Sequence, residues 1–152
     1  MADGKASKSK SLFRMECAVS VSIKASPETI WRLLTDSREF ARWNSSVVSL
    51  DGRIALGETI QLKVDYAPSR TFKLRVSEFV PNARMVWRDG SAPMFQGVRT
   101  YTLTPRGDGS TEFSMVEVLS GLLLPMIGGS LPDFAPPFER YAADLKKAAE
   151  GR

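Results

Sequence analysis

Two charged residues stand inside strand-like runs of apolar side chains in the second half of the sequence. Residues 97–104 and 111–119 alternate apolar and polar side chains, which is typical of β-strands with one buried face. Arg99 and Glu117 fall in the buried phase of that alternation. A hairpin register that places Leu103 opposite Phe113 also places Arg99 opposite Glu117. The pattern therefore predicts an ion pair on an apolar face.

This ion pair permits three interpretations. Removing two ions from water costs several kcal/mol per ion, so a purely structural sheet rarely selects such a pair. In the first interpretation, the pair orients the polar head of an otherwise apolar ligand. In the second, Arg99 polarises a carbonyl group and Glu117 acts as a base. In the third, the two ions only satisfy each other at the end or the rim of a cavity.

The residue types exclude several kinds of chemistry. The sequence contains no histidine, which excludes acid–base, triad and metal mechanisms that depend on this residue. Its one cysteine, Cys17, continues an apolar alternation and is expected to be inert core. We predict no metal site and no cofactor; the catalytic residues are unknown, with Glu117 and Arg99 as candidates.

Further side chains share the phase of the same face or lie on the helix expected to cover it. The candidate ligand-binding residues are Leu74, Met85, Trp87, Phe95, Arg99, Tyr101, Phe113, Met115, Glu117, Phe138 and Tyr141. We expect Phe95 in the loop before its strand. The alternative is an ordinary core, because aromatic and branched residues fill sheets with or without a ligand. Buried phenols need a hydrogen-bond partner, so a ligand oxygen is a candidate partner for Tyr101 and Tyr141.

The elements that must position these residues follow a clear order. Residues 13–24 alternate without interruption and predict a first strand. Ser26 and Pro27 then supply an N-cap hydroxyl and a proline for the first turn, so a short helix follows. A second short helix carries Phe40 and Trp43. Six further strands are predicted at residues 47–50, 59–64, 71–79, 84–88, 97–104 and 111–119.

The only long helical pattern lies at the C-terminal end. Phe134, Phe138, Tyr141 and Leu145 recur at spacings of four, three and four residues, as in an amphipathic helix. Seven antiparallel strands need a cover for their apolar face, and this helix is the only large element available. We therefore predict an α+β fold in which a curved, seven-stranded antiparallel sheet wraps around a long C-terminal helix, with two short helices after the first strand.

Composition limits the remaining possibilities. Residues 1–12 carry a net charge of +2 and predict a disordered basic tail before a single domain at residues 13–152. The other +2 of the net charge is scattered, without a basic stripe, which argues against nucleic-acid binding. The apolar run at residues 121–129 is too short to span a bilayer. We expect a cytoplasmic protein, monomeric or weakly dimeric, without stable membrane insertion.

Two segments resemble the SRPBCC superfamily, also called START-like or helix-grip, which includes polyketide cyclases, the birch pollen allergen type and Hsp90-ATPase activator domains. They are ASPETIWRLLTDSREFARWN at residues 25–44 and GVRTYTLTPRGDGSTEFSMVEVLSGLLLP at residues 97–125. The resemblance implies a helix-grip fold with an apolar cavity between the sheet and the long helix. A bacterial subgroup often has a histidine where this chain has Arg99, so a histidine-dependent activity does not carry over.

Three functions are consistent with these expectations. The first is binding of an apolar or amphipathic small molecule, such as a lipid, a polyketide or an isoprenoid-like compound, in the internal cavity. The second is a polyketide cyclase/dehydratase-like activity that uses Glu117 and Arg99 without histidine or metal. The third is an Hsp90-activator-like interaction domain, which requires an exposed apolar patch. The segment at residues 121–129 is either a flexible lid over the cavity or a simple cover of the sheet.

Overall fold

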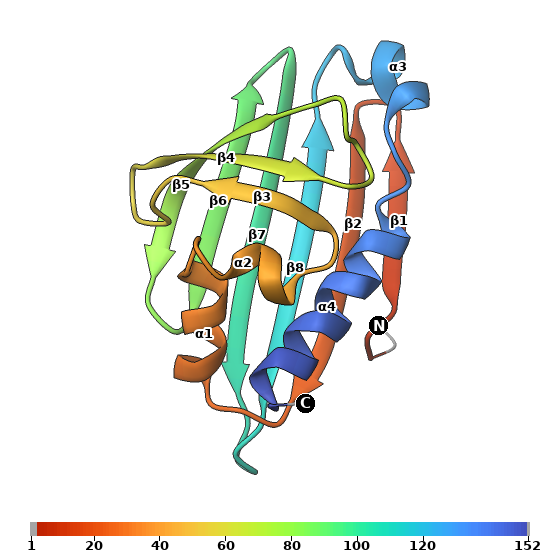
Figure 1. Ribbon diagram of the computed structural model, residues 1–152. Coiled ribbons are helices and arrows are strands. Elements are labelled where there is room, and N and C mark those ends of the chain that lie inside the picture. Colours follow the sequence, from red (N-terminus) through yellow and green to blue (C-terminus); the bar gives the residue numbers. More distant parts are fainter. Residues whose placement is uncertain (1–2, 152) are drawn as a thin grey trace.

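One curved antiparallel sheet carries helices on its concave side (Figure 1). The computed structural model describes residues 3–151, so the predictions for residues 1, 2 and 152 lie outside the described residues. The strands are β1 (Ala6–Ser11), β2 (Arg14–Ile23), β3 (Val47–Asp51), β4 (Thr59–Val64), β5 (Phe72–Val80), β6 (Arg84–Ser91), β7 (Phe95–Pro105) and β8 (Thr111–Ser120). Their order across the sheet is β1-β2-β8-β7-β6-β5-β4-β3. The predicted α+β helix-grip architecture is confirmed.

The sheet has eight strands instead of the predicted seven, because part of the expected basic tail forms the edge strand β1. This strand pairs with β2 along its whole length, from Ala6 opposite Val19 to Ser11 opposite Arg14. Its sequence, ASKSKS, contains no large apolar residue, so hydrophobic periodicity gives no signal for it. The backbone ladder holds it in place, and lysines are suited to an exposed edge.

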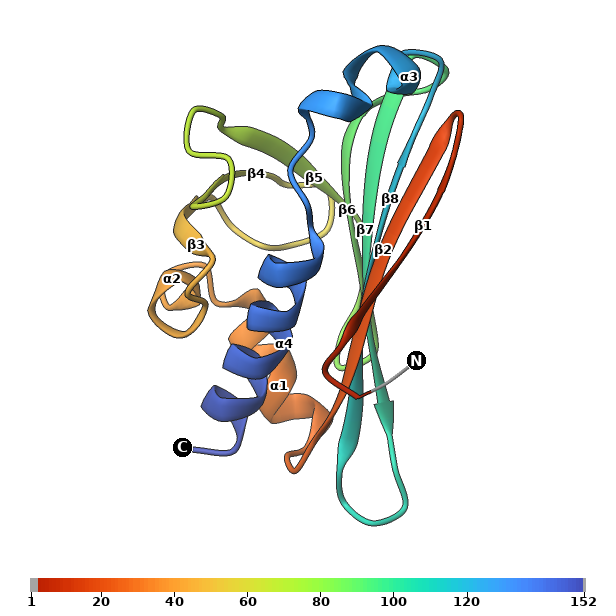
Figure 2. The same cartoon turned by 90° about the vertical axis from the view of Figure 1, so that its right-hand side faces the viewer.

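The two short helices after the first strand and the long C-terminal helix lie close to the expected positions, whereas residues 124–130, for which no helix was predicted, also form helical turns. They are α1 (Pro27–Thr35), α2 (Phe40–Trp43), α3 (Leu124–Ile127), followed by a 3-10 turn (Gly128–Ser130), and the long α4 (Ala135–Ala149). The Ser26 hydroxyl caps α1 by accepting a hydrogen bond from the Thr29 N–H at 3.2 Å. Figure 2 shows α1 and α4 on the same side of the sheet, where β3 and β4 curl around to meet them. None of the described helices is both long and apolar enough to cross a membrane.

The central hairpin has the predicted register. Strands β7 and β8 pair Leu103 with Phe113, Tyr101 with Met115, and Arg99 with Glu117. Gly97, Arg99, Tyr101 and Leu103 are all buried, so the odd-numbered side chains of β7 face inward. One detail was wrong: β7 begins at Phe95, which pairs with Ser91 of β6 and therefore lies in the strand and not in a loop.

Aromatic side chains fill the space between the body of α4 and the sheet. The Tyr141 ring on α4 stacks on Phe113 of β8, with centroids 6.1 Å apart, and meets Trp43 of α2 edge-on at 5.5 Å. The Tyr141 hydroxyl donates a hydrogen bond to the Tyr101 hydroxyl at 3.2 Å. The two buried phenols therefore satisfy each other within a solid core.

Candidate functional site

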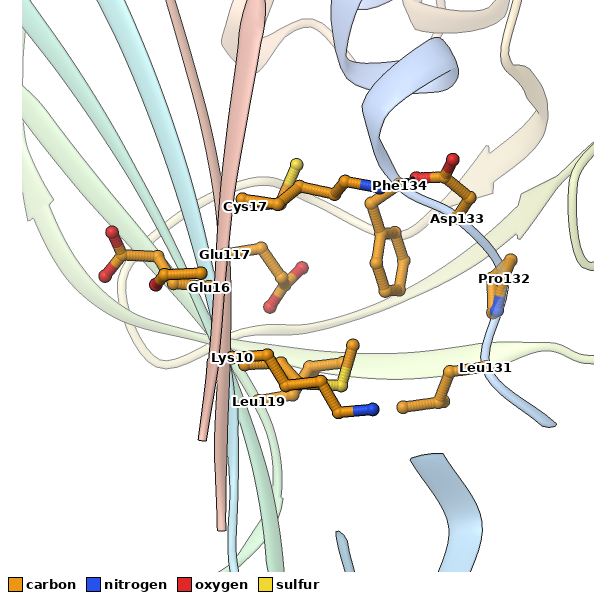
Figure 3. Close-up of a pocket in the computed structure, with 12 residues that line it drawn as sticks. Lys10, Glu16, Cys17, Glu117, Leu119, Leu131, Pro132, Asp133 and Phe134 are labelled. Carbon is orange, nitrogen blue, oxygen red and sulfur yellow. Dashed lines mark hydrogen bonds and ion pairs between the residues drawn. The ribbon is translucent and has the colours of Figure 1, made fainter. Parts of the chain in front are cut away.

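A hollow lies beside the N-terminal end of α4. Its larger part, the outer cavity, has a volume of about 440 Å³ and lies between the concave face of β1, β2 and β8 and the connector at residues 131–134. Figure 3 shows Leu131, Pro132 and Phe134 across the cavity from Cys17 and Glu117.

A smaller inner cavity, of about 70 Å³, extends toward β4–β7. The outer and inner cavities share five wall residues, which are Glu117, Leu119, Leu131, Pro132 and Phe134. The two spaces therefore adjoin.

The position of this hollow corrects one expectation. We predicted a cavity between the sheet and the C-terminal helix, but no residue of Ala135–Ala149 lines either part of it. The physical reason is volume: large buried aromatic side chains such as Phe138 and Tyr141 occupy the layer under α4, as close packing of protein interiors requires. The connector at residues 131–134 before α4 is not helical, and both cavities are lined by it.

The eleven predicted ligand-binding residues divide into two groups. Five line the hollow: Leu74, Trp87, Phe95, Arg99 and Glu117. The other six lie in the packed core and border neither cavity: Met85, Tyr101, Phe113, Met115, Phe138 and Tyr141. The inward phase of the strands was right for both groups, but periodicity does not distinguish a cavity wall from a filled core.

A buried ion pair marks the boundary between the two cavities. The Arg99 Nε donates a hydrogen bond to Glu117 Oε1 at 3.0 Å, and the two side chains are only 10% and 13% exposed. The guanidinium carbon of Arg99 also lies 5.0 Å from the centroid of the Phe138 ring, within range of a cation–π interaction. Glu117 borders both cavities, whereas Arg99 borders only the inner one.

Burial and mutual attraction set the protonation of this pair in opposite ways. Burial raises the pKa of the Glu117 carboxyl, and the Arg99 charge and hydrogen bond oppose that rise. Burial alone lowers the pKa of the Arg99 guanidinium, but Glu117 and the neighbouring phenols raise it well above its ordinary value. Arg99 therefore stays positively charged, and Glu117 is the member of the pair that can exchange a proton.

Two polar atoms at the hollow have no partner in the described part of the chain. Glu117 accepts from Arg99 through Oε1, while its Oε2 receives no hydrogen bond from the described residues. Trp87 lines the inner cavity and is 1% exposed, yet its indole Nε1–H has no acceptor there. An unsatisfied buried donor costs about 1–3 kcal/mol, so an acceptor that reaches it gains affinity.

Lysines stand at the β1 edge of the outer cavity. Lys8 and Lys10 lie opposite Cys17 and Met15 of β2 and share their concave face. The Lys8 ammonium forms an ion pair with Asp133 at 3.0 Å, which links β1 to the connector. Sequence reasoning missed both lysines as site residues, because it assigned them to a disordered tail. The alternation of serine and lysine at residues 7–11 was the available signal.

Cys17 lines the outer cavity but is expected to react slowly. Burial raises the pKa of its thiol from 9.0 to about 11, so the thiolate fraction near neutral pH falls about a hundredfold. We expect iodoacetamide to alkylate Cys17 of the native protein at least about a hundredfold more slowly than the urea-unfolded protein. Intact-mass measurement over time gives both rates. Similar rates in the two states would show that Cys17 is not shielded.

Three comparisons relate this geometry to known proteins. A sequence model of the family described as polyketide cyclase / dehydrase and lipid transport matches residues 14–150. No protein with a curated description matches the chain in a sequence search.

Solved structures share the fold at low sequence identity. A START superfamily protein from Mycobacterium smegmatis has a TM-score of 0.66 at 17% identity, with 90% of this chain and 97% of that chain covered. The Aha1 dimer from Colwellia psychrerythraea has a TM-score of 0.66 at 17% identity, with 89% of this chain and 96% of that chain covered. Truncated norcoclaurine synthase from Thalictrum flavum has a TM-score of 0.66 at 10% identity, with 97% of each chain covered. These likenesses show the START-like fold.

Because the family match runs from β2 to the end of α4, the chain belongs to the polyketide cyclase / dehydrase and lipid transport family of the START-like (SRPBCC) superfamily.

Proposed function

We propose that this protein binds an apolar or amphipathic small molecule, such as a lipid, a polyketide or an isoprenoid-like compound, in the outer and inner cavities. The observation that carries the proposal is an outer cavity of about 440 Å³ that adjoins the inner cavity, with the buried Arg99–Glu117 ion pair at their boundary. That volume falls in the range of roughly 300–1,000 Å³ typical of small-molecule sites. Burial of ligand surface against Met15, Leu119, Leu131 and Phe134 supplies affinity at about 25 cal/mol per Å².

The polar groups at the boundary select the ligand's orientation. A carbonyl or hydroxyl oxygen that enters the inner cavity lies among wall residues that include Arg99 and Trp87, and the indole N–H of Trp87 has no acceptor among the described residues. The apolar part of the ligand then lies in the outer cavity. A molecule with one oxygen-bearing end and an apolar body therefore fits better than a pure hydrocarbon.

A cavity-filling variant tests the proposal. Leu119 lies on β8 in the wall of both cavities, whereas its neighbour Val118 lines neither. The probe is the fluorescent dye anilinonaphthalene sulfonate, which fatty acids are expected to displace. We expect Leu119→Trp to lower the affinity for this probe by at least about tenfold, because the indole occupies the ligand's volume. Val118→Trp adds the same indole to the other face of the strand and is the matched control. Unchanged affinity in Leu119→Trp would refute the cavity as the binding site.

A second candidate function is favoured by the free oxygen of Glu117. A carboxyl whose pKa is raised by burial, and whose side chain lines a cavity, has the properties of a general acid or base. A cyclase/dehydratase-like reaction on a poly-β-ketone uses such a group. Glu117→Gln keeps the shape and an acceptor for Arg99, so we expect it to abolish turnover of a poly-β-ketone and to retain probe binding. Turnover that survives this substitution would eliminate Glu117 as the base.

The remaining expectations are untested by the fold. A cytoplasmic location, a monomeric or weakly dimeric state, and a chaperone-activating interaction stay predictions from the sequence.

A further inference from the structure

Exposed apolar side chains gather at one end of the molecule. Of the large apolar residues that are exposed, five come from three segments at this end: Leu12, Phe13, Met94, Leu122 and Met126. They belong to the β1–β2 turn, the β6–β7 turn and the segment around α3. Figures 1 and 2 both show these three segments together at the end of the sheet far from the C-terminus. We call these five residues the apolar tip.

Backbone hydrogen bonds hold the three segments together as one surface. The Gly121 N–H donates to the Phe13 carbonyl at 3.1 Å, and the Leu122 N–H donates to the Pro93 carbonyl at 2.9 Å. Gly121 has a φ of +135°, and a Cβ there would collide with the Met94 carbonyl oxygen. Only glycine permits this approach of the chain segments. The three segments of the apolar tip are therefore joined to one another by backbone hydrogen bonds.

The charges around the apolar tip are positive. Residues 9–15, 91–96 and 120–132 contain Lys10 and Arg14 and no aspartate or glutamate. The acids within three residues of these ranges are Glu16, Asp89, Glu117 and Asp133. Glu16, Glu117 and Asp133 form ion pairs with Arg14 at 2.7 Å, with Arg99 at 3.0 Å and with Lys8 at 3.0 Å, and Asp89 lines the inner cavity. Lys10 forms no ion pair with any residue that the structure describes. An apolar surface with the unpaired cation of Lys10 at its border is complementary to an anionic lipid surface.

The segments that carry the apolar tip continue along the chain into the wall of the outer cavity. Met15 follows Phe13 by two residues, and Leu131 and Pro132 follow the α3 segment; all three line the outer cavity. A surface bound at the apolar tip would therefore lie next to the cavity wall formed by the connector and β1–β2. The five residues of the apolar tip line neither cavity themselves; the chain connects them to the outer cavity through Met15, Leu131 and Pro132.

We propose that the apolar tip docks onto an anionic lipid bilayer, with Phe13, Leu122 and Met126 in the interfacial layer and Lys10 near the lipid headgroups. Docking would place the outer cavity at the membrane surface. An apolar ligand can then pass between the bilayer and the cavity without crossing water. The inference goes beyond ligand binding and does not depend on it, since peripheral docking and cavity occupancy are measured separately.

Vesicle co-sedimentation of the full chain tests this proposal. We expect binding to vesicles of phosphatidylcholine with phosphatidylserine, and weaker binding to phosphatidylcholine alone. Met126→Asp, at a residue that is 81% exposed, should lower the binding at least about tenfold, because a carboxylate replaces an inserted side chain. Leu56→Asp, at a residue 64% exposed and outside the apolar tip, carries the same charge change and should bind like the unaltered protein. Lys10→Gln should lower binding to the anionic vesicles about fivefold.

Three results would overturn the proposal. The first is no association of the unaltered protein with anionic vesicles. The second is an equal loss of vesicle binding in Met126→Asp and Leu56→Asp, together with no loss in Met126→Ser. Thermal unfolding must show that both aspartate variants are folded. The third is a concentration-dependent dimer, seen by sedimentation velocity, that Met126→Asp dissociates in a protein that does not bind vesicles. That last result would make the apolar tip a protein interface.

Discussion

Replacing Arg99 by methionine alone is expected to lower the free energy of unfolding by about 3–5 kcal/mol, because the Glu117 carboxylate is then buried without its cation. Glu117→Leu leaves the guanidinium buried without its anion and should have a similar effect. Urea denaturation at neutral pH measures both losses. The exposed pair Arg84–Glu78, with side chains 46% and 43% exposed, is the control, and Arg84→Met should cost less than about 1 kcal/mol.

The double variant Arg99→Met/Glu117→Leu separates the interpretations of the ion pair. Removing both ions together leaves no unpaired charge, so we expect the stability to return to within about 1 kcal/mol of the unaltered protein. A ligand-orienting pair predicts that this stable double variant loses affinity for amphipathic fatty acids and retains hydrophobic dye binding. Undiminished fatty-acid affinity would leave the pair with a structural role only. A double variant as unstable as the single variants would contradict the electrostatic explanation itself.

Truncating Tyr141 to alanine should also destabilise the protein by about 3–5 kcal/mol, because its ring lies at the centre of the aromatic cluster under α4. Tyr141→Phe keeps the ring and removes only the hydrogen bond to Tyr101, at a cost of about 1 kcal/mol. Lys147→Ala, on the exposed face of the same helix, should change stability by less than about 0.5 kcal/mol. Thermal and urea unfolding of the three variants give the comparison.

The same variants test where the ligand site ends. Tyr141 borders neither cavity, so Tyr141→Phe should bind the fluorescent probe with unchanged affinity. A tenfold loss of affinity in this well-folded variant would return Tyr141 to the ligand site, as the sequence pattern first indicated. The expected result follows because the Tyr141 hydroxyl already donates its hydrogen to Tyr101 within the core.

Local patterns predicted most of the fold because each reports a short-range physical constraint. Ser26 and Pro27 mark the start of α1, since a free hydroxyl and a missing N–H suit that position. The alternation in β7 and β8 predicted their register, since a slip of one residue would turn Arg99 and Tyr101 to the outer face. Edge strand β1 escaped prediction because its stability comes from the β2 ladder and not from apolar side chains.

The sequence by itself determined which side chains face inward and that an arginine and a glutamate meet among them. Only the tertiary structure decided where the interior is filled and where it is hollow, which places Tyr101 and Tyr141 in core and Arg99 and Glu117 at a cavity. Periodicity specifies the direction of a side chain, whereas empty volume depends on the distance between elements far apart in the chain. Here the outer cavity lies between the connector at residues 131–134 and the strands β1, β2 and β8. No local sequence pattern specifies the distance between these elements.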